Sequence, residues 1–192
     1  VVQIWKPKEL NTFETEWGFS CMSYEISGAL GIKMAKPDQD VIVFVGDGSY
    51  LLQNSDIYSS VLYDKKLIIV VCDNGGHMVI NRLQLAKGGK EYLCNLNAAR
   101  ASNVHFVDFE THAKSMGANG ETVKSISELE AAFKRAKVSH KTYVITIKTD
   151  GYEWLEGTAF WESPTLEVTS TKGNKVAYDE YVEGKSKQRK GL

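Results

Sequence analysis

Two apolar runs, each followed at once by a glycine-rich turn, constrain the fold of this chain more than any other feature of its sequence. The runs cover residues 41–45 and 67–72 and consist mostly of β-branched residues. Such runs are typical of strands that are buried on both faces, as in a parallel sheet between helices. The turns that follow are residues 46–49 and 73–76. Because parallel strands end at the same edge of a sheet, we expect the two turns to converge there on one ligand site.

The rest of the chain alternates between helical and extended patterns. We expect helices at about 22–35, 53–63, 108–116 and 127–138, a short helix at 79–84 within a polar section reaching residue 103, and a third strand at 143–147. Ser127 and Glu130 match an S-x-x-E capping box for the helix at 127–138. The alternation predicts an α/β fold, a three-layer sandwich in which helices flank a mostly parallel central sheet. We assign residues 1–168 to this domain and residues 169–192 to a basic surface tail or helix.

Composition narrows the classes of function. The 192 residues carry a formal net charge of −1, which provides no basic footprint for nucleic acid. No apolar run approaches the length that spans a bilayer, roughly 20 residues. The three cysteines are widely spaced, which favours reduced thiols and a cytoplasmic location. Because the first residue is Val1 rather than Met, we expect a piece of a longer polypeptide; removal of an initiator Met by processing is the alternative.

The two turns offer the oxygen ligands that magnesium prefers. Asp47 supplies a carboxylate and Asn74 a side-chain carbonyl, and Gly76 supplies a backbone carbonyl. Each turn alone is more simply read as a connection between a strand and a helix. Their paired occurrence, each at a strand end, favours a site for a cation and a diphosphate.

Small residues beside these ligands suit close contact with phosphate oxygens. Gly46 and Gly48 let the backbone approach an anion. Ser49 and the amides that lead into the next helix are candidate hydrogen-bond donors to it. Among the histidines, His105, His112 and His140 have no metal-ligand spacing.

Residues 46–74 resemble the cofactor-binding motif of thiamine-diphosphate-dependent enzymes, a superfamily that includes pyruvate decarboxylase and acetolactate synthase. That motif is glycine-aspartate-glycine, a spacer of this length, and asparagine. The resemblance implies thiamine diphosphate and Mg²⁺ as cofactors. It also implies that Met22 props the bound cofactor into its bent conformation, whereas the simpler reading of Met22 is a filler of a core gap.

Within that superfamily, residues 16–31, 73–77 and 80–84 are similar to the trihydroxycyclohexane-1,2-dione hydrolases of myo-inositol catabolism. Residues 150–153, Trp161 and the tail also resemble that family's C-terminal end. The resemblance covers essentially the whole chain, as the diphosphate-binding domain of a protein about three times longer. It implies hydrolytic opening of a cyclic dione. Alternatives are a 2-oxo acid decarboxylase, an acetolactate synthase-type domain, or a non-catalytic cofactor-binding module. A nucleotide-binding Rossmann domain is disfavoured, because no G-x-G-x-x-G follows the first strand.

Three positions depart from the family pattern. Ser23 stands where glycine is usual, Asp73 replaces the first of two asparagines, and His77 occupies a position where an aromatic residue is commoner. His77 is a candidate for contact with the diphosphate or the substrate, and equally a partly exposed loop residue.

The family's activating glutamate is missing from this chain. By resemblance it lies on a pyrimidine-binding domain of the same polypeptide, which acts across a dimer interface. Glu14, Glu16 and Glu25 show no matching pattern. We therefore assign no catalytic residue here, and expect a homo-oligomeric enzyme whose isolated C-terminal part is inactive.

Overall fold

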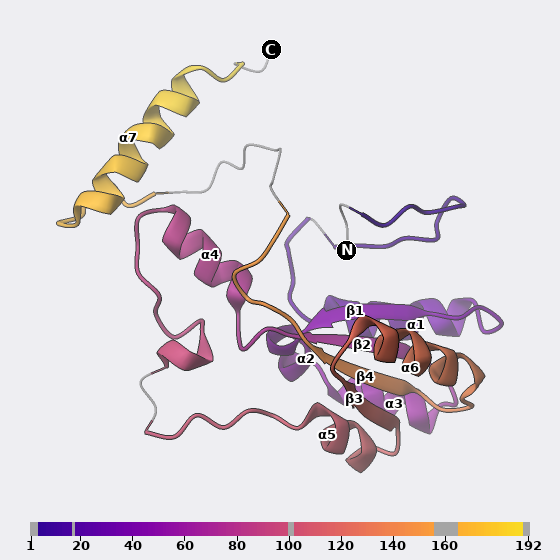
Figure 1. Ribbon diagram of the computed structural model, residues 1–192. Coiled ribbons are helices and arrows are strands. Elements are labelled where there is room, and N and C mark those ends of the chain that lie inside the picture. Colours follow the sequence, from indigo (N-terminus) through magenta and orange to yellow (C-terminus); the bar gives the residue numbers. More distant parts are fainter. Residues whose placement is uncertain (1–3, 17, 100–101, 156–164, 190–192) are drawn as a thin grey trace. The chain divides into compact units, whose positions relative to one another are not determined.

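The computed structural model describes residues 4–16, 18–99, 102–155 and 165–189 (Figure 1). The chain forms two compact units. The first comprises Val1–Asn74 and His105–Thr149, and the second Gly75–Val104 and Asp150–Leu192. Trp17 and Trp161, which belong to the family resemblance, lie outside the described residues. Within the described part of the chain, no helix combines the length and apolar character needed to cross a membrane.

The first unit is built on a four-stranded sheet with the strand order β1-β2-β4-β3, in which every pair is parallel. The strands are β1 (Ile42–Gly46), β2 (Ile68–Asp73), β3 (Asn119–Val123) and β4 (Tyr143–Lys148). The central strand β2 is buried at residues 68–71, as its unbroken apolar run predicts. The expected strands at 41–45, 67–72 and 143–147 are therefore confirmed.

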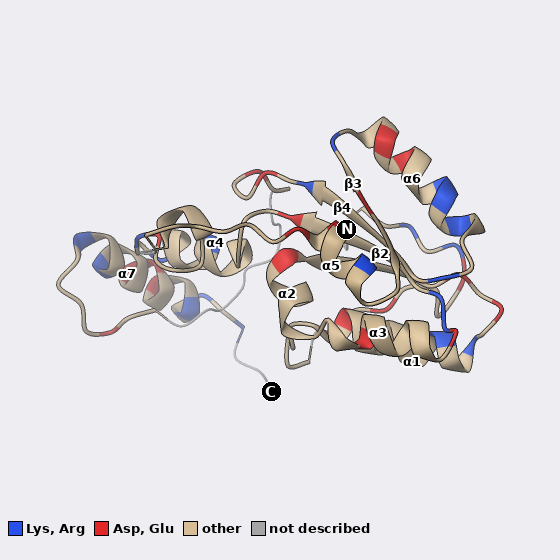
Figure 2. Cartoon of the chain, turned by 90° about the horizontal axis from the view of Figure 1, so that it is seen from below, with Lys and Arg blue, Asp and Glu red and all other residues tan. Residues whose placement is uncertain are grey.

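Helices cover both faces of the sheet, as Figure 2 shows from below. One face packs its valines and isoleucines against Ile26, Ile57 and Phe109, which come from three different helices. The opposite face packs Ile68 and Ile145 against α6. The helices of this unit are α1 (Tyr24–Ala35), α2 (Asp47–Leu52), α3 (Ser55–Leu62), α5 (Phe109–Ser115) and α6 (Ile126–Val138). The three-layer α/β prediction is confirmed.

The strand order explains why α6, unlike the other described helices of this unit, packs on the second face. The chain moves in one direction across the sheet from β1 to β2 and on to β3, with α3 and α5 on the same face. It then turns back from β3 to β4 through α6 on the other face. A reversal of direction with right-handed crossovers requires this change of face. Figure 2 also shows acidic residues towards the start of α6 and basic residues towards its end, which suits the helix dipole.

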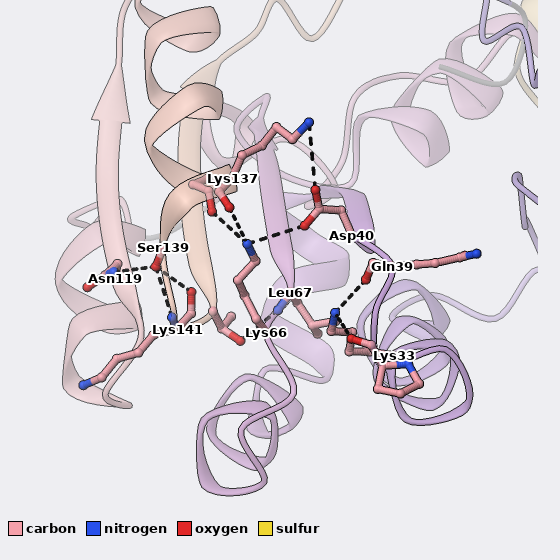
Figure 3. Close-up of polar contacts among 12 residues, drawn as sticks. Lys33, Gln39, Asp40, Lys66, Leu67, Asn119, Lys137, Ser139 and Lys141 are labelled. Carbon is pink, nitrogen blue, oxygen red and sulfur yellow. Dashed lines mark hydrogen bonds and ion pairs between the residues drawn. The ribbon is translucent and has the colours of Figure 1, made fainter.

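Two lysines tie the amino-terminal edge of the sheet to its helices (Figure 3). Lys33 is buried, and its Nζ donates to the carbonyls of Pro37 and Gln39 at 2.7 and 2.6 Å. Lys66 Nζ donates to the Lys137 carbonyl at 2.8 Å, at the end of α6. Lys33 thus satisfies carbonyls of the loop after α1, and Lys66 satisfies a carbonyl that the end of α6 leaves unpaired. This edge is therefore structural, and the opposite edge is where the ligand-bearing turns lie.

The described residues of the second unit form two α-helices and a short 3₁₀ turn: α4 (Met78–Ala86), η1 (Leu96–Ala98) and α7 (Lys172–Ser186). Asn174 Nδ2 donates to the Lys87 carbonyl at 2.6 Å, which ties the start of α7 to the end of α4. Gly88 and Gly173 meet here so closely that a Cβ on Gly88 would lie 2.2 Å from the Gly173 carbonyl carbon. Within the tail expected at 169–192, residues Lys172–Ser186 thus form a helix.

Three details differ from the sequence prediction. Residues 119–123 form the edge strand β3, which was not predicted because its Asn-Gly-Glu-Thr-Val sequence is mostly polar. Residues 47–52 form α2 rather than a turn. The capping box lies two residues earlier than expected: the Glu128 amide donates to Ser125 Oγ at 3.2 Å, and Glu128 Oε2 accepts from the Lys124 amide at 2.8 Å.

Candidate functional site

Asp47 and Asn74 meet at the carboxyl edge of the sheet. Asp47 begins α2 directly after β1, and Asn74 directly follows β2. The two strands are neighbours, with Gly46 paired in register with Cys72. The Asn74 amide donates to Asp47 Oδ1 at 3.4 Å. The convergence expected from the two apolar runs is therefore present.

The Asp47 carboxylate lies in a buried setting, with only 4% of the residue exposed. A buried carboxylate needs polar partners or a cation to offset its lost hydration. Burial raises the pKa of the Cys72 thiol on the neighbouring strand, and the negative charge of Asp47 also raises it. Cys72 is therefore a neutral thiol rather than a nucleophile at this edge.

Gly46 leaves open space beside Asp47. Its φ of −76° and ψ of 157° are extended values that any residue adopts. Apart from its two chain neighbours, no heavy atom of the described residues would lie within 4 Å of a Cβ built on Gly46. Neither backbone conformation nor packing therefore requires glycine at this position, and the space that a side chain would fill is available to a ligand. Gly48 is buried one residue beyond Asp47, within α2.

An ion pair between a buried carboxylate and an exposed ammonium supports the turn that carries Asn74. Asp73 ends β2, is only 4% exposed, and pairs with Lys148 Nζ at 2.5 Å. The same ammonium lies 4.9 Å from the centre of the Phe106 ring. The Asp73 carbonyl accepts from the Thr149 amide at 2.9 Å. Asp73 stands where the family usually has asparagine, and in this chain its carboxylate pairs with the lysine at the end of β4.

Met22 and Ser49, which lie on different elements, line one groove of about 750 Å³ in the first unit. The groove runs between the N-terminal segment, α1 and the edge strand β1; Trp5, Phe13, Tyr24 and Ile32 also line it. Met22 is 39% exposed, so it is not a core filler. Ser23 takes a φ of 78°, the left-handed conformation that favours the glycine usual in the family.

Glu16 organises the loop that carries Met22, a role that the sequence reasoning missed. Its carboxylate oxygens accept from the amides of Phe19 and Cys21, both at 2.7 Å. These backbone hydrogen bonds lower the pKa of Glu16, so the carboxylate is charged at neutral pH. The signal available in the sequence was an acidic residue just before Gly18 in an otherwise polar-aromatic segment.

Gly76 and His77 lie in the second unit. Gly76 has a φ of +136°, and a Cβ there would lie 2.4 Å from the Cys94 carbonyl oxygen, so only glycine fits. The His77 amide donates to that same carbonyl oxygen at 2.7 Å. His77 Nδ1 is buried and has no hydrogen-bond partner among the described residues. His77 is therefore more enclosed than a simple loop histidine.

Asp47 and Asn74, which the structure brings together, both offer side-chain oxygens to a cation. Across the described ranges, no group of three or more His, Cys, Asp or Glu side chains could hold a metal ion. One carboxylate and one amide suit Mg²⁺, which often takes few protein ligands and completes its shell with water and substrate phosphates. The donor set, the buried carboxylate and the open space at Gly46 together fit a magnesium–diphosphate group.

A protein family and several named relatives match this chain. The family described as "Thiamine pyrophosphate enzyme, C-terminal TPP binding domain" matches residues 1–147. The chain is 36% identical over 183 residues to a protein of Halalkalibacterium halodurans named 3D-(3,5/4)-trihydroxycyclohexane-1,2-dione hydrolase, and 37% identical over 182 residues to one of the same name from Shouchella clausii. Each alignment covers 92% of this chain and 28% of the relative. The chain thus spans little more than a quarter of the length of these relatives.

A solved structure supports the fold. The thiamine diphosphate-dependent 4-hydroxybenzoylformate decarboxylase of Rhodococcus jostii RHA1 matches with a TM-score of 0.56 and 24% identity, over 67% of this chain and 23% of that one. At this identity the likeness concerns the fold alone. From the family match and the hydrolase relatives, the chain belongs to the thiamine pyrophosphate enzymes, as a C-terminal TPP-binding domain.

Proposed function

We propose that this chain binds thiamine diphosphate together with Mg²⁺ as the C-terminal part of a ring-opening hydrolase. In this proposal Asp47 contributes a carboxylate oxygen to the metal, Asn74 its amide oxygen, and Gly76 its backbone carbonyl. Phosphate oxygens and water complete the shell. The observation that carries the proposal is the meeting of Asp47 and Asn74 at one sheet edge, with open space at Gly46.

The remaining candidate residues have roles around the cofactor. Gly46 and Gly48 admit the diphosphate, Ser49 donates a hydrogen bond to it, and His77 contacts the diphosphate or the substrate. Met22 supports the bent cofactor from the groove that it shares with Ser49. Bound thiamine diphosphate supplies an electron sink for carbanion chemistry, while the protein binds and orients it. The residues of this chain therefore act by holding and positioning.

The name of the hydrolase relatives supports a wider proposal. We propose a trihydroxycyclohexane-1,2-dione as substrate, within inositol catabolism in the cytoplasm. The partner would be a pyrimidine-binding domain of the same protein, acting across a dimer interface and supplying the activating glutamate. In this proposal residues 1–168 form the cofactor domain and residues 169–192 its tail. The isolated chain then binds the cofactor without turnover.

Calorimetry tests the cofactor assignment. Thiamine diphosphate titrated into the chain is expected to bind with Mg²⁺ and not with EDTA, because Asp47, Asn74 and Gly76 would hold the diphosphate by way of the metal. Asp47→Ala should abolish the Mg²⁺-dependent heat. Asp38→Ala is a matched control, because Asp38 is exposed and lies outside the site. Binding that survives both EDTA and Asp47→Ala would overturn the proposal.

A reconstitution assay tests the reaction. The chain would be mixed with the N-terminal part of its polypeptide and supplied with the cyclic dione, with release of the ring-opened acid as the readout. Turnover of pyruvate without ring opening would instead favour a decarboxylase or acetolactate synthase-type enzyme. Cofactor binding without activity towards either substrate would favour a binding module.

A further inference from the structure

Three side chains from separate segments of the second unit converge on one carboxylate oxygen. Glu91 Oε1 accepts from Tyr152 Oη at 2.6 Å, from Asn81 Nδ2 at 2.8 Å and from Asn95 Nδ2 at 3.3 Å. Asn81 lies on α4 and is fully buried, and Asn95 is 3% exposed. A charged acceptor strengthens each of these bonds relative to a neutral one. Glu91 therefore joins α4, the loop before η1 and the segment after β4.

The position of Tyr152 is set locally. Asp150 Oδ1 accepts from the Tyr152 amide at 2.7 Å and from the Glu153 amide at 3.2 Å, which forms an Asx turn. The Tyr152 hydroxyl donates to Glu91 and accepts from Asn95 Nδ2 at 2.6 Å. The Asp-Gly-Tyr-Glu run that resembles the hydrolases thus orients a phenol onto Glu91.

Asn95 connects this network to the backbone of residues 75–77. Asn95 and Gly76 form an antiparallel bridge. On either side of Asn95, the Cys94 carbonyl accepts from the His77 amide at 2.7 Å, and the Leu96 amide donates to the Gly75 carbonyl at 2.9 Å. The backbone of segment 94–96 therefore holds the backbone of Gly75, Gly76 and His77 in place through hydrogen bonds.

The pKa shifts of Glu91 and Tyr152 keep both groups in the protonation states that their hydrogen bonds require. The hydrogen bond from Tyr152, followed by those from Asn81 and Asn95, lowers the pKa of Glu91. The bond to Glu91 in turn raises the pKa of Tyr152. At neutral pH Glu91 is charged and Tyr152 keeps its proton, which is the pairing that the hydrogen bonds require.

We propose that Glu91 is a positioning residue: through Tyr152 and Asn95 it holds the Gly75–His77 backbone in the conformation needed for cation and diphosphate binding. The link to binding depends on the proposed function, in which Gly76 offers its carbonyl to Mg²⁺. The network acts on Gly76 and His77 through the backbone bonds of segment 94–96.

Hydrogen exchange of the apo chain tests the positioning directly. Glu91→Ala removes the shared acceptor, and Tyr152→Phe removes only the hydroxyl. Both should speed exchange at the His77 and Leu96 amides by about tenfold or more, equivalent to about 1.4 kcal/mol. Exchange in β2 should stay as in the wild type. Glu153→Ala is the matched control, because Glu153 is exposed and adjacent to Tyr152. Its backbone amide donates to Asp150, and the substitution keeps this bond.

Cofactor affinity supplies a second readout. With Mg²⁺ present, Tyr152→Phe should raise the Kd of thiamine diphosphate by about tenfold with little change in melting temperature. A purely structural role would lower the melting temperature and leave the Kd of the folded fraction unchanged. Wild-type exchange at His77 and Leu96 in Tyr152→Phe would overturn the inference, even if Glu91→Ala does not fold. If the wild type binds no cofactor, the proposed function fails and the exchange result still decides the positioning.

Discussion

Replacing Gly46 by alanine should separate the stability of the fold from the affinity of the site. Gly46 has extended backbone angles, and an added Cβ would meet no heavy atom of the described residues within 4 Å, apart from the two chain neighbours. Alanine at such a position restricts the unfolded chain without straining the folded one, which stabilises by about 0.4–1 kcal/mol. For a chain of this size, that gain raises the melting temperature by roughly 1–4 °C.

Cofactor binding should change in the opposite direction. In the proposed site the diphosphate occupies the space beside Gly46, so the added methyl group has to displace it. Overpacking of this kind costs about 1–3 kcal/mol. The Kd of thiamine diphosphate with Mg²⁺ should therefore rise by roughly 5- to 150-fold. Thermal unfolding followed by circular dichroism measures the first effect, and calorimetry measures the second.

Gly76→Ala provides the contrast. Its φ of +136° and the distance of 2.4 Å from an added Cβ to the Cys94 carbonyl oxygen oppose any side chain. This variant should lose stability by about 1–3 kcal/mol from backbone strain alone. A lower melting temperature of Gly46→Ala would contradict the open space beside Gly46, because protein would then fill it. Wild-type cofactor affinity of Gly46→Ala would contradict a diphosphate in that space.

Two further predictions concern charged pairs in the first unit. Lys148→Met removes the ammonium that pairs with the buried Asp73 carboxylate, although the lysine itself is largely exposed. The fold should therefore lose about 1–3 kcal/mol in urea unfolding. A loss below about 0.3 kcal/mol would show that the pair contributes nothing, as many exposed pairs do. Burial raises the pKa of Glu121, but hydrogen bonds from Arg135 and Tyr143 outweigh it and hold the net pKa below 4.5. The stabilisation from Glu121 is therefore present above the unfolded pKa and lost as pH falls through the folded one. Unfolding midpoints measured from about pH 7 down to about pH 3 should fall less steeply for Glu121→Gln than for the wild type, and parallel curves would contradict this.

The central geometry could be predicted because it depends on local patterns. Buried parallel strands show as unbroken apolar runs, and residues that follow such strands meet at one edge. Asp47 and Asn74 could therefore be placed together from the sequence. The helix from Tyr24 to Ala35 was predictable for the same reason, since its apolar spacing and the following Pro37 are local signals.

Other features depend on contacts that no local pattern shows. The strand Asn119–Val123 is recognisable only through its pairing with β4, because an edge strand needs few apolar residues. Residues 47–52 form a helix although Gly48 lies near its start, with Tyr50 fully buried. One hydrogen bond of the Glu91 network joins residues 61 positions apart, so its partners could not be matched from spacing alone.

The proposed site requires above all that Asp47 and Asn74 share one cation. A double-mutant cycle tests this claim: the affinity of thiamine diphosphate at fixed Mg²⁺ is measured for the wild type, Asp47→Asn, Asn74→Ala and the double variant. If both side chains ligate one Mg²⁺, each single change removes most of the same interaction, and the coupling energy should exceed about 1 kcal/mol. Losses that add to within about 0.5 kcal/mol would show that the two residues act independently, and would contradict the shared site.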